Sequence, residues 1–261
     1  MPEVKGYITD DNGTRIPGYR EIRLAYRVWR QSLFPNFNLR DFYEIGFQTQ
    51  PKCWRLALDH KVQEAAETFV GEAMVGLTRD EVRYLARKVF LEDSHFYGLL
   101  TRLPKAGKLM DTKPVPGANE TARAAKTMGK KTGILSLGFE EFILGHIEHH
   151  GLTGYFDVIL ANRLAYLDGK VVGINRRVQE KGSGMEKVLS DLELPADGSG
   201  VVFVGDSELD VPGFRKVEYP VVVASAKPEF KERCSADPEF GDRILIAEDG
   251  YEEIASRFNL F

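Results

Sequence analysis

The chain has 261 residues, which is enough for one large domain or two smaller domains that share an interface. Hydrophobic residues make up 43% of the sequence, which suffices for a buried core, and the formal net charge is -4. Because lysine and arginine are scattered along the chain, we expect no nucleic-acid-binding surface.

The two cysteines, Cys53 and Cys234, lie far apart in the sequence, which predicts reduced thiols and a cytoplasmic protein. The N-terminus lacks the apolar run of a signal peptide, and no segment approaches the roughly 18 apolar residues of a membrane span. We therefore expect no membrane partner. The sequence leaves a monomer and a homodimer equally open.

The first part of the chain predicts one strand followed by helices. Residues 4–9 read as a short strand, and a turn-rich segment follows it. Between residues 19 and 103, apolar residues recur three and four positions apart, which predicts helices. Within this block, Thr78 and Glu81 have the spacing of a capping box and predict a helix start. Residues 104–117 are rich in proline, glycine and lysine and predict a linker.

Helices and strands alternate after the linker. Further helices are predicted at residues 118–128, 139–149 and 181–192. Strands are predicted at residues 132–135, 156–161, 164–167, 171–174, 201–204, 221–224 and 244–247. Asp168-Gly169 predicts the turn of a hairpin between two of these strands.

This alternation predicts an α/β fold with a Rossmann-like, mainly parallel sheet and helices on both faces. Residues 1–18 and 104–261 would form this core domain, which includes the first strand. Residues 19–103 would form an all-helical cap domain inserted after that strand.

Carboxylates follow the predicted strand at residues 201–204. Asp206 and Asp210 come directly after this apolar run, and a buried anion is costly without a positive partner. Hard divalent cations prefer carboxylate oxygens, but helix N-termini also favour acidic residues. The segment alone therefore leaves a metal site and an acidic helix start both open. In sheets of this type ligands bind beyond the carboxyl ends of the strands, where Asp10 and Ser136 are also predicted to lie.

Four elements occur in a fixed order along the chain. They are Asp10 in DDNGT, Ser136 in GILSLGF, Lys181 in EKGSGMEKVL, and Asp206 with Asp210 in VGDSELD. Together they resemble the four motifs of the haloacid dehalogenase-like (HAD) hydrolase superfamily, most members of which are magnesium-dependent phosphatases. The strings SLGFEEFILGHI, FDVILANRLAYLDGKVVGI and VGDSELDVPGF resemble the phosphoserine-phosphatase-like branch of that superfamily.

The resemblance implies a magnesium-dependent phosphomonoester hydrolase that acts on a small phosphorylated metabolite through an aspartyl-phosphate. The catalytic residues that it implies are Asp10, Asn12, Ser136 and Lys181. The residues that would bind the substrate phosphate are Ser136, Leu137, Gly138 and Lys181. The Mg²⁺ site would be formed by Asp10, the backbone carbonyl of Asn12, Asp206 and Asp210. Serine specificity is not implied, because the glutamate that phosphoserine phosphatases place soon after the first motif has no match here.

The first motif departs from the family pattern Asp-x-Asp-Gly-Thr, in which the second Asp is the general acid and base. Asn12 stands at that position, and an amide can neither protonate a leaving alkoxide nor accept a proton from water. General acid-base catalysis contributes about 10²–10⁴-fold, so turnover should be slow.

Three explanations of Asn12 stay open. It could be natural, and mark a slow enzyme, a phosphotransferase with a long-lived aspartyl-phosphate, or a catalytically silent phosphate-binding protein. It could be an engineered substitution. In the third explanation, Asp11 takes over the proton transfer.

Overall fold

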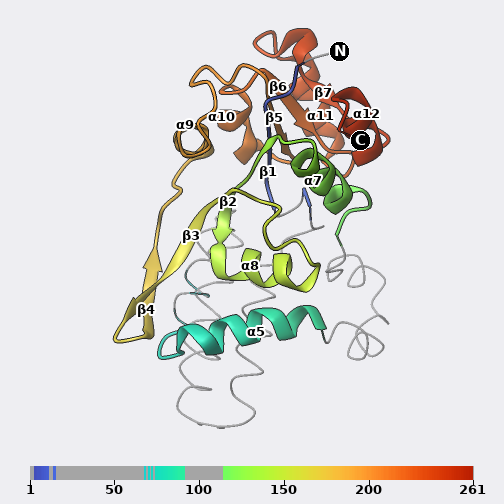
Figure 1. The fold of residues 1–261 in the computed structure, drawn as a ribbon. Coiled ribbons are helices and arrows are strands. Elements are labelled where there is room, and N and C mark those ends of the chain that lie inside the picture. The colour runs from blue at the N-terminus through green and yellow to red at the C-terminus, as the bar shows by residue number, and fades with distance from the viewer. Residues whose placement is uncertain are drawn as a thin grey trace, which may run out of the picture.

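Seven strands form one sheet in the order β4-β3-β2-β1-β5-β6-β7 (Figure 1). The computed structural model describes residues 3–11, 14–15, 68, 70, 72, 74–91 and 114–260. The strands are β1 (Gly6–Thr9), β2 (Lys131–Phe139), β3 (Val158–Leu167), β4 (Lys170–Asn175), β5 (Val201–Gly205), β6 (Tyr219–Val222) and β7 (Leu245–Ile246). All neighbours pair in parallel except β3 and β4, which form an antiparallel hairpin. The predicted mainly parallel sheet, with the first strand inside it, is confirmed.

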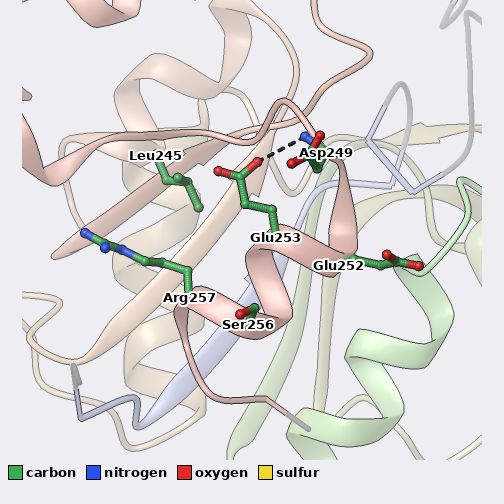
Figure 2. Close-up of a pocket in the computed structure, with 6 residues that line it drawn as sticks. All are labelled: Leu245, Asp249, Glu252, Glu253, Ser256 and Arg257. Carbon is green, nitrogen blue, oxygen red and sulfur yellow. Dashed lines mark hydrogen bonds between the residues drawn. The ribbon is translucent and has the colours of Figure 1, made fainter.

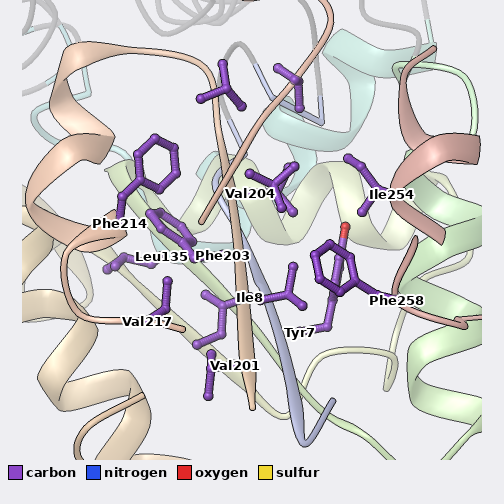
Figure 3. Packing of buried hydrophobic residues seen from close by; sticks show 14 of the residues in the cluster. Tyr7, Ile8, Leu135, Val201, Phe203, Val204, Phe214, Val217, Ile254 and Phe258 are labelled. Carbon is purple, nitrogen blue, oxygen red and sulfur yellow. The ribbon is translucent and has the colours of Figure 1, made fainter. Parts of the chain in front are cut away.

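Helices cover both faces of this sheet. The described helices are α5 (Arg79–Leu91), α7 (Ala118–Thr127), α8 (Glu140–His149), α9 (Lys181–Asp191), α10 (Val211–Phe214), α11 (Pro228–Ala236) and α12 (Tyr251–Arg257), with short 3-10 turns at Glu208–Asp210 and Gly241–Arg243. Helices α9 and α10 lie on one side of β1 and β5, and α7 and α12 lie on the other (Figures 1 and 3). None of the described helices is long and apolar enough to cross a membrane.

The central strands β1 and β5 are buried over their full length. Strands covered by helices on both faces read as continuous apolar runs, which explains the sequence VVFVG of β5. Ile8, Phe203 and Val204 belong to the main core cluster, and Phe203 packs against Phe214 of α10 with ring centroids 5.4 Å apart (Figure 3). This packing fixes the two strands whose ends carry the carboxylates described below.

The register of the sheet brings three strand ends together. Thr9 is paired with Ile134 of β2 and with Val204 of β5. Because these strands are parallel, the residues that follow β1 and β5 emerge at the same edge. The prediction that Asp10, Ser136 and Asp206 share this edge is confirmed.

Strands β2 and β3 depart furthest from their predicted extents, while β1, β6 and β7 differ from theirs by one or two residues at an end. The strand predicted to end at Leu135 continues through Ser136 to Phe139, and its register with β3 shifts between Leu135 and Phe139. The two strands predicted at 156–161 and 164–167 form the single strand β3. Asn162, which lies between the two predicted strands, is buried and hydrogen-bonded to Leu137 of β2 and to Arg177.

The predicted capping box at Thr78 is confirmed. The Glu81 amide donates to Thr78 Oγ1 at 3.2 Å, and the Thr78 amide donates to Glu81 Oε2 at 2.8 Å, at the start of α5. Helix α5 packs closely on α8, since a Cβ added to Gly145 would lie 2.9 Å from the Cβ of Ala86. The other helices predicted between residues 19 and 103 lie outside the described residues, so the division into core and cap stays a prediction.

Candidate active site

Three carboxylates meet at the carboxyl ends of β1 and β5. Oxygens of Asp10, Asp206 and Asp210 all lie within 4.8 Å of one another. Asp10 directly follows β1, and its amide donates to the carbonyl of Val204 at 2.9 Å. Asp206 directly follows β5, and Asp210 ends the short turn after it. The parallel pairing of the two central strands therefore builds this cluster from segments that are far apart in the sequence.

Asp210 is held by the backbone of its own turn. Its Oδ2 accepts hydrogen bonds from the amides of Asp206 and Ser207, each at 2.9 Å, and from Ser207 Oγ at 3.2 Å. A Cβ added to Gly205 would lie 2.4 Å from Asp210 Cγ. A glycine is thus required at position 205 because the carboxylate of Asp210 occupies the space that a side chain would need.

Lys181 brings the one buried ammonium group of the described residues to this cluster. It is the first residue of α9 and is 2% exposed. Its Nζ lies 2.7 Å from Asp10 Oδ2 and also contacts Asp210 Oδ1. Lys181 therefore joins the first and the last of the four predicted motifs.

The charges of the cluster do not balance within the described residues. Burial raises the pKa of Asp10 to about 6, with Lys181 opposing and Asp210 adding to the shift. Burial, reinforced by Asp210 and Asp10, raises the pKa of Asp206 to about 8. Burial lowers the pKa of Lys181, but Asp10 and Asp210 more than offset this and leave the pKa raised. Three ionised carboxylates against one ammonium leave an excess of negative charge, which a cation would neutralise.

The oxygens of the cluster suit a hard divalent cation. Asp10 Oδ1 is buried and accepts no hydrogen bond from any residue that the structure describes. Asp206 Oδ1 accepts a hydrogen bond from Thr14 Oγ1 at 3.0 Å, which fixes the orientation of that carboxylate. An unpartnered buried carboxylate oxygen is costly, so the chain fits a metal ion at this position. Asn12, whose carbonyl was predicted as a further ligand, lies outside the described residues.

Ser136 lies at the same edge, on the irregular end of β2. Its hydroxyl is buried and accepts a hydrogen bond from the Gly138 amide at 3.2 Å. Asn162 of β3 donates to the carbonyl of Leu137 at 2.8 Å and accepts from the amides of Arg177 and Val178, each at 2.9 Å. One buried amide thus ties the end of β2 that carries Ser136 to the segment that leads into Lys181. This role of Asn162 was not predicted, although a polar residue inside a strand was the available signal.

Tyr251 is a second residue whose part in the site was not predicted. It is buried on α12, and its hydroxyl donates to the carbonyl of Thr14 at 3.2 Å. Since Thr14 in turn donates to Asp206, the C-terminal helix supports the loop after β1. Nothing in the local sequence around Tyr251 indicates this contact, because it joins residues 237 positions apart.

A separate hollow of about 730 Å³ shares no residue with the carboxylate cluster (Figure 2). Its lining residues are Leu245, Asp249, Glu252, Glu253, Ser256 and Arg257. The Asp249 amide donates to Glu253 Oε2 at 3.0 Å, within the first turn of α12. Three acidic side chains against one arginine would repel an anionic ligand, so this hollow does not compete with the cluster as a phosphate site.

Comparison with known proteins decides the family. A family model described as a haloacid dehalogenase-like hydrolase matches residues 5–218. The chain belongs to the haloacid dehalogenase-like hydrolase family. The predicted resemblance to this family is confirmed, and the matched region contains all four motifs. No curated protein matches the sequence at a significant level.

Solved structures similar to this HAD-like hydrolase share its fold over almost the whole chain. A phospho-aspartyl intermediate analogue of phosphoserine phosphatase has 21% identity and a TM-score of 0.58, with 98% of this chain and 99% of that chain covered. A substrate-bound phosphoserine phosphatase has 18% identity and a TM-score of 0.59, with 99% of both chains covered. A probable phosphoserine phosphatase from Vibrio cholerae has 14% identity and a TM-score of 0.63, with 99% of this chain and 66% of that chain covered.

The raised carboxyl pKa values predict that metal-free stability falls as the pH rises. A carboxyl group with a raised pKa binds more protons in the folded state, so its contribution is fully present below the ordinary value near 4. That contribution is lost as the pH rises through about 6 for Asp10 and about 8 for Asp206. Melting temperatures with EDTA and with Mg²⁺ should therefore differ more at a pH of about 8.5 than at about 5.5. Asp206→Asn should shrink this difference, and an equal gain from Mg²⁺ at both pH values would contradict the prediction.

Gly205→Ala should weaken both folding and Mg²⁺ binding. The added Cβ would overlap Asp210 and force its carboxylate away from the Asp206 amide, at a cost of about 1–3 kcal/mol in the free energy of unfolding. Calorimetric titration with Mg²⁺ and chemical denaturation measure the two effects. Gly133→Ala in β2 is a matched control, because its added Cβ meets apolar side-chain atoms and no carboxylate: Leu192 Cδ1 and Val188 Cγ1 at 3.3 Å and Ile8 Cγ1 at 3.6 Å. Equal behaviour of the two variants would refute the assigned role of Gly205.

Proposed function

We propose that this HAD-like hydrolase is a magnesium-dependent phosphomonoester hydrolase that acts on a small phosphorylated metabolite. The proposal rests on one observation: at the edge of the sheet, Asp10 contacts the buried Lys181 and lies close to two further carboxylates. Family membership supports hydrolase chemistry, and the four motifs favour a phosphate ester as the substrate.

Asp10 would act as the nucleophile. One of its oxygens is 2.7 Å from the ammonium of Lys181, while the other accepts no hydrogen bond from the described residues. Attack of a carboxylate oxygen on phosphorus would form an aspartyl-phosphate and release the alcohol, and water would then hydrolyse the acyl phosphate. The similarity in fold to a phospho-aspartyl intermediate analogue of phosphoserine phosphatase supports this route.

Catalysis of phosphoryl transfer consists mainly of positioning and of neutralising charge on the phosphoryl oxygens. Lys181 would place its positive charge beside Asp10 and the incoming phosphate, and the hydroxyl of Ser136 would donate to a phosphate oxygen. The backbone of Leu137 and Gly138 would complete the phosphate-binding site. A magnesium ion, when bound, would supply further positive charge; its ligands would be Asp10, Asp206 and the carbonyl of Asn12, with Asp210 in support.

The proton transfers are the weak part of this site. Asn12 cannot perform them, and the environment of Asp11 argues against a substitute there. Asp11 Oδ1 accepts a hydrogen bond from Arg15 Nη1 at 3.2 Å, and Arg15 is fully buried. This contact holds the Asp11 carboxylate at Arg15, whereas Asp10 contacts Lys181, so we propose that turnover is slow and not rescued by Asp11.

Asp10→Asn should abolish phosphate release while the fold is retained. The amide has nearly the same shape as the carboxylate but cannot attack phosphorus. Phosphate release from p-nitrophenyl phosphate and from a panel of phosphorylated metabolites, with and without Mg²⁺, measures the effect. Persistent Mg²⁺-dependent release by Asp10→Asn would exclude Asp10 as the nucleophile.

Asn12→Asp should raise turnover by about 10²-fold or more, because it restores a general acid and base. The same metabolite panel measures the gain. If neither the parent protein nor its Asn12→Asp variant releases phosphate while both still bind Mg²⁺, a catalytically silent phosphate-binding protein would be favoured. A trapped aspartyl-phosphate that transfers to an acceptor other than water would instead favour a phosphotransferase.

A further inference from the structure

Arg15, which directly follows Thr14, has the largest fully buried side chain among the described residues. Its guanidinium donates from Nη1 to Asp11 Oδ1 at 3.2 Å and from Nη2 to Asn119 Oδ1 at 3.3 Å. Nη2 also lies 3.5 Å from Nδ1 of His146, which lies on α8. A single cation therefore contacts the start of the loop and two helices of the core.

The backbone on either side of this pair is fixed as well. The Arg15 amide donates to the carbonyl of Asp11 at 3.1 Å, and the Arg15 carbonyl accepts from the Val115 amide at 2.7 Å. The guanidinium also lies over the ring of Phe156, 4.7 Å from its centroid. The two ends of the loop, Asp11 and Arg15, are thus joined to each other and attached to the core.

Stability alone does not account for this arrangement. Burying two charges costs about as much as their attraction returns, and apolar residues of similar volume are often equally stable. Arg15 Nε, moreover, is buried without a hydrogen-bond partner among the described residues, which adds to the cost. The pair also fixes the geometry of the chain at Asp11, an effect that is separate from stability.

That geometry separates two adjacent carboxylates. Asp10 contacts Lys181 of α9, whereas Asp11 contacts Arg15 beside α7 and α8. Without Arg15, Asp11 would lose the cation that it contacts here, and it would compete with Asp10 for Lys181 and for a metal ion. Both residues offer the same chemical group, and they differ in the direction in which the backbone points them and in the partners that hold them there.

We infer that Asp11 and Arg15 are positioning residues that direct Asp10, rather than its neighbour, toward Lys181 and the metal site. This inference rests on the proposed function for its kinetic consequences, but its consequences for metal binding do not depend on turnover. Neither residue touches the reacting atoms, so both act through Asp10 and the loop to Thr14.

A stability-matched double variant separates positioning from a purely structural role. Arg15→Met alone should lower the melting temperature strongly, because it removes the cation that Asp11 contacts in a buried setting. Asp11→Leu combined with Arg15→Met removes both charges and should melt at or near the temperature of the parent chain. We nevertheless expect the double variant to bind Mg²⁺ at least about tenfold more weakly. Its kcat should fall by about 10²-fold and its KM should change less, because a displacement of the Asp10 carboxylate by about 1 Å would have an effect of this size.

The test uses the full chain, calorimetric titration with Mg²⁺, thermal melting, and phosphate release. A double variant that regains the parent's melting temperature, Mg²⁺ affinity and kcat together would overturn the inference. Arg83→Met is the matched control, since Arg83 pairs with Glu148 while 61% of its side chain is exposed, and it should change none of the three quantities. If the parent binds Mg²⁺ but releases no phosphate, the proposed function fails, and the Mg²⁺ affinities of the variants still decide the inference.

Discussion

The contact of the Lys181 ammonium with Asp10 and Asp210 is the interaction on which the site depends. Without this cation, three carboxylates would lie close together at the carboxyl edge of the sheet with no positive partner among the described residues. With it, Asp10 is oriented by Lys181, Asp210 by the turn after β5, and Asp206 by Thr14. The remaining negative charge makes the site suitable for a divalent cation and, with that cation, for a phosphate group.

The sheet provides the rigidity that this charge arrangement needs. Parallel pairing of β1 with β5 places Asp10 and Asp206 side by side, and helices on both faces exclude water from the strands beneath them. Supports that touch no reacting atom come from distant parts of the chain, namely Asn162 of β3 and Tyr251 of α12, and from the nearby Arg15. The positions of the carboxylates are therefore determined by packing and hydrogen bonds, since their mutual repulsion alone would separate them.

The succession of strands and the four motifs were largely predictable because each has a local signal, whereas helices α10, α11 and α12 were not predicted. Apolar runs marked β1 and β5, the Asp168-Gly169 pair marked the β3–β4 hairpin, and Thr78 with Glu81 marked the start of α5. The ends of the strands were less predictable than their order. The strands predicted at residues 156–161 and 164–167 form the single strand β3, and β2 continues past Leu135 with an altered register.

The sequence by itself determined the fold class, the family and the chemical groups available to the site, because these follow from residue type, spacing and the periodicity of apolar positions. It also raised the question of Asn12, whose amide cannot transfer protons. Only the tertiary structure decided which partner each carboxylate has: Lys181 for Asp10, the turn amides for Asp210, Thr14 for Asp206 and Arg15 for Asp11. The physical reason is that four chemically identical groups differ in their surroundings, and the partners of Asp10 and Asp206 come from segments that are distant in the chain and adjacent in space.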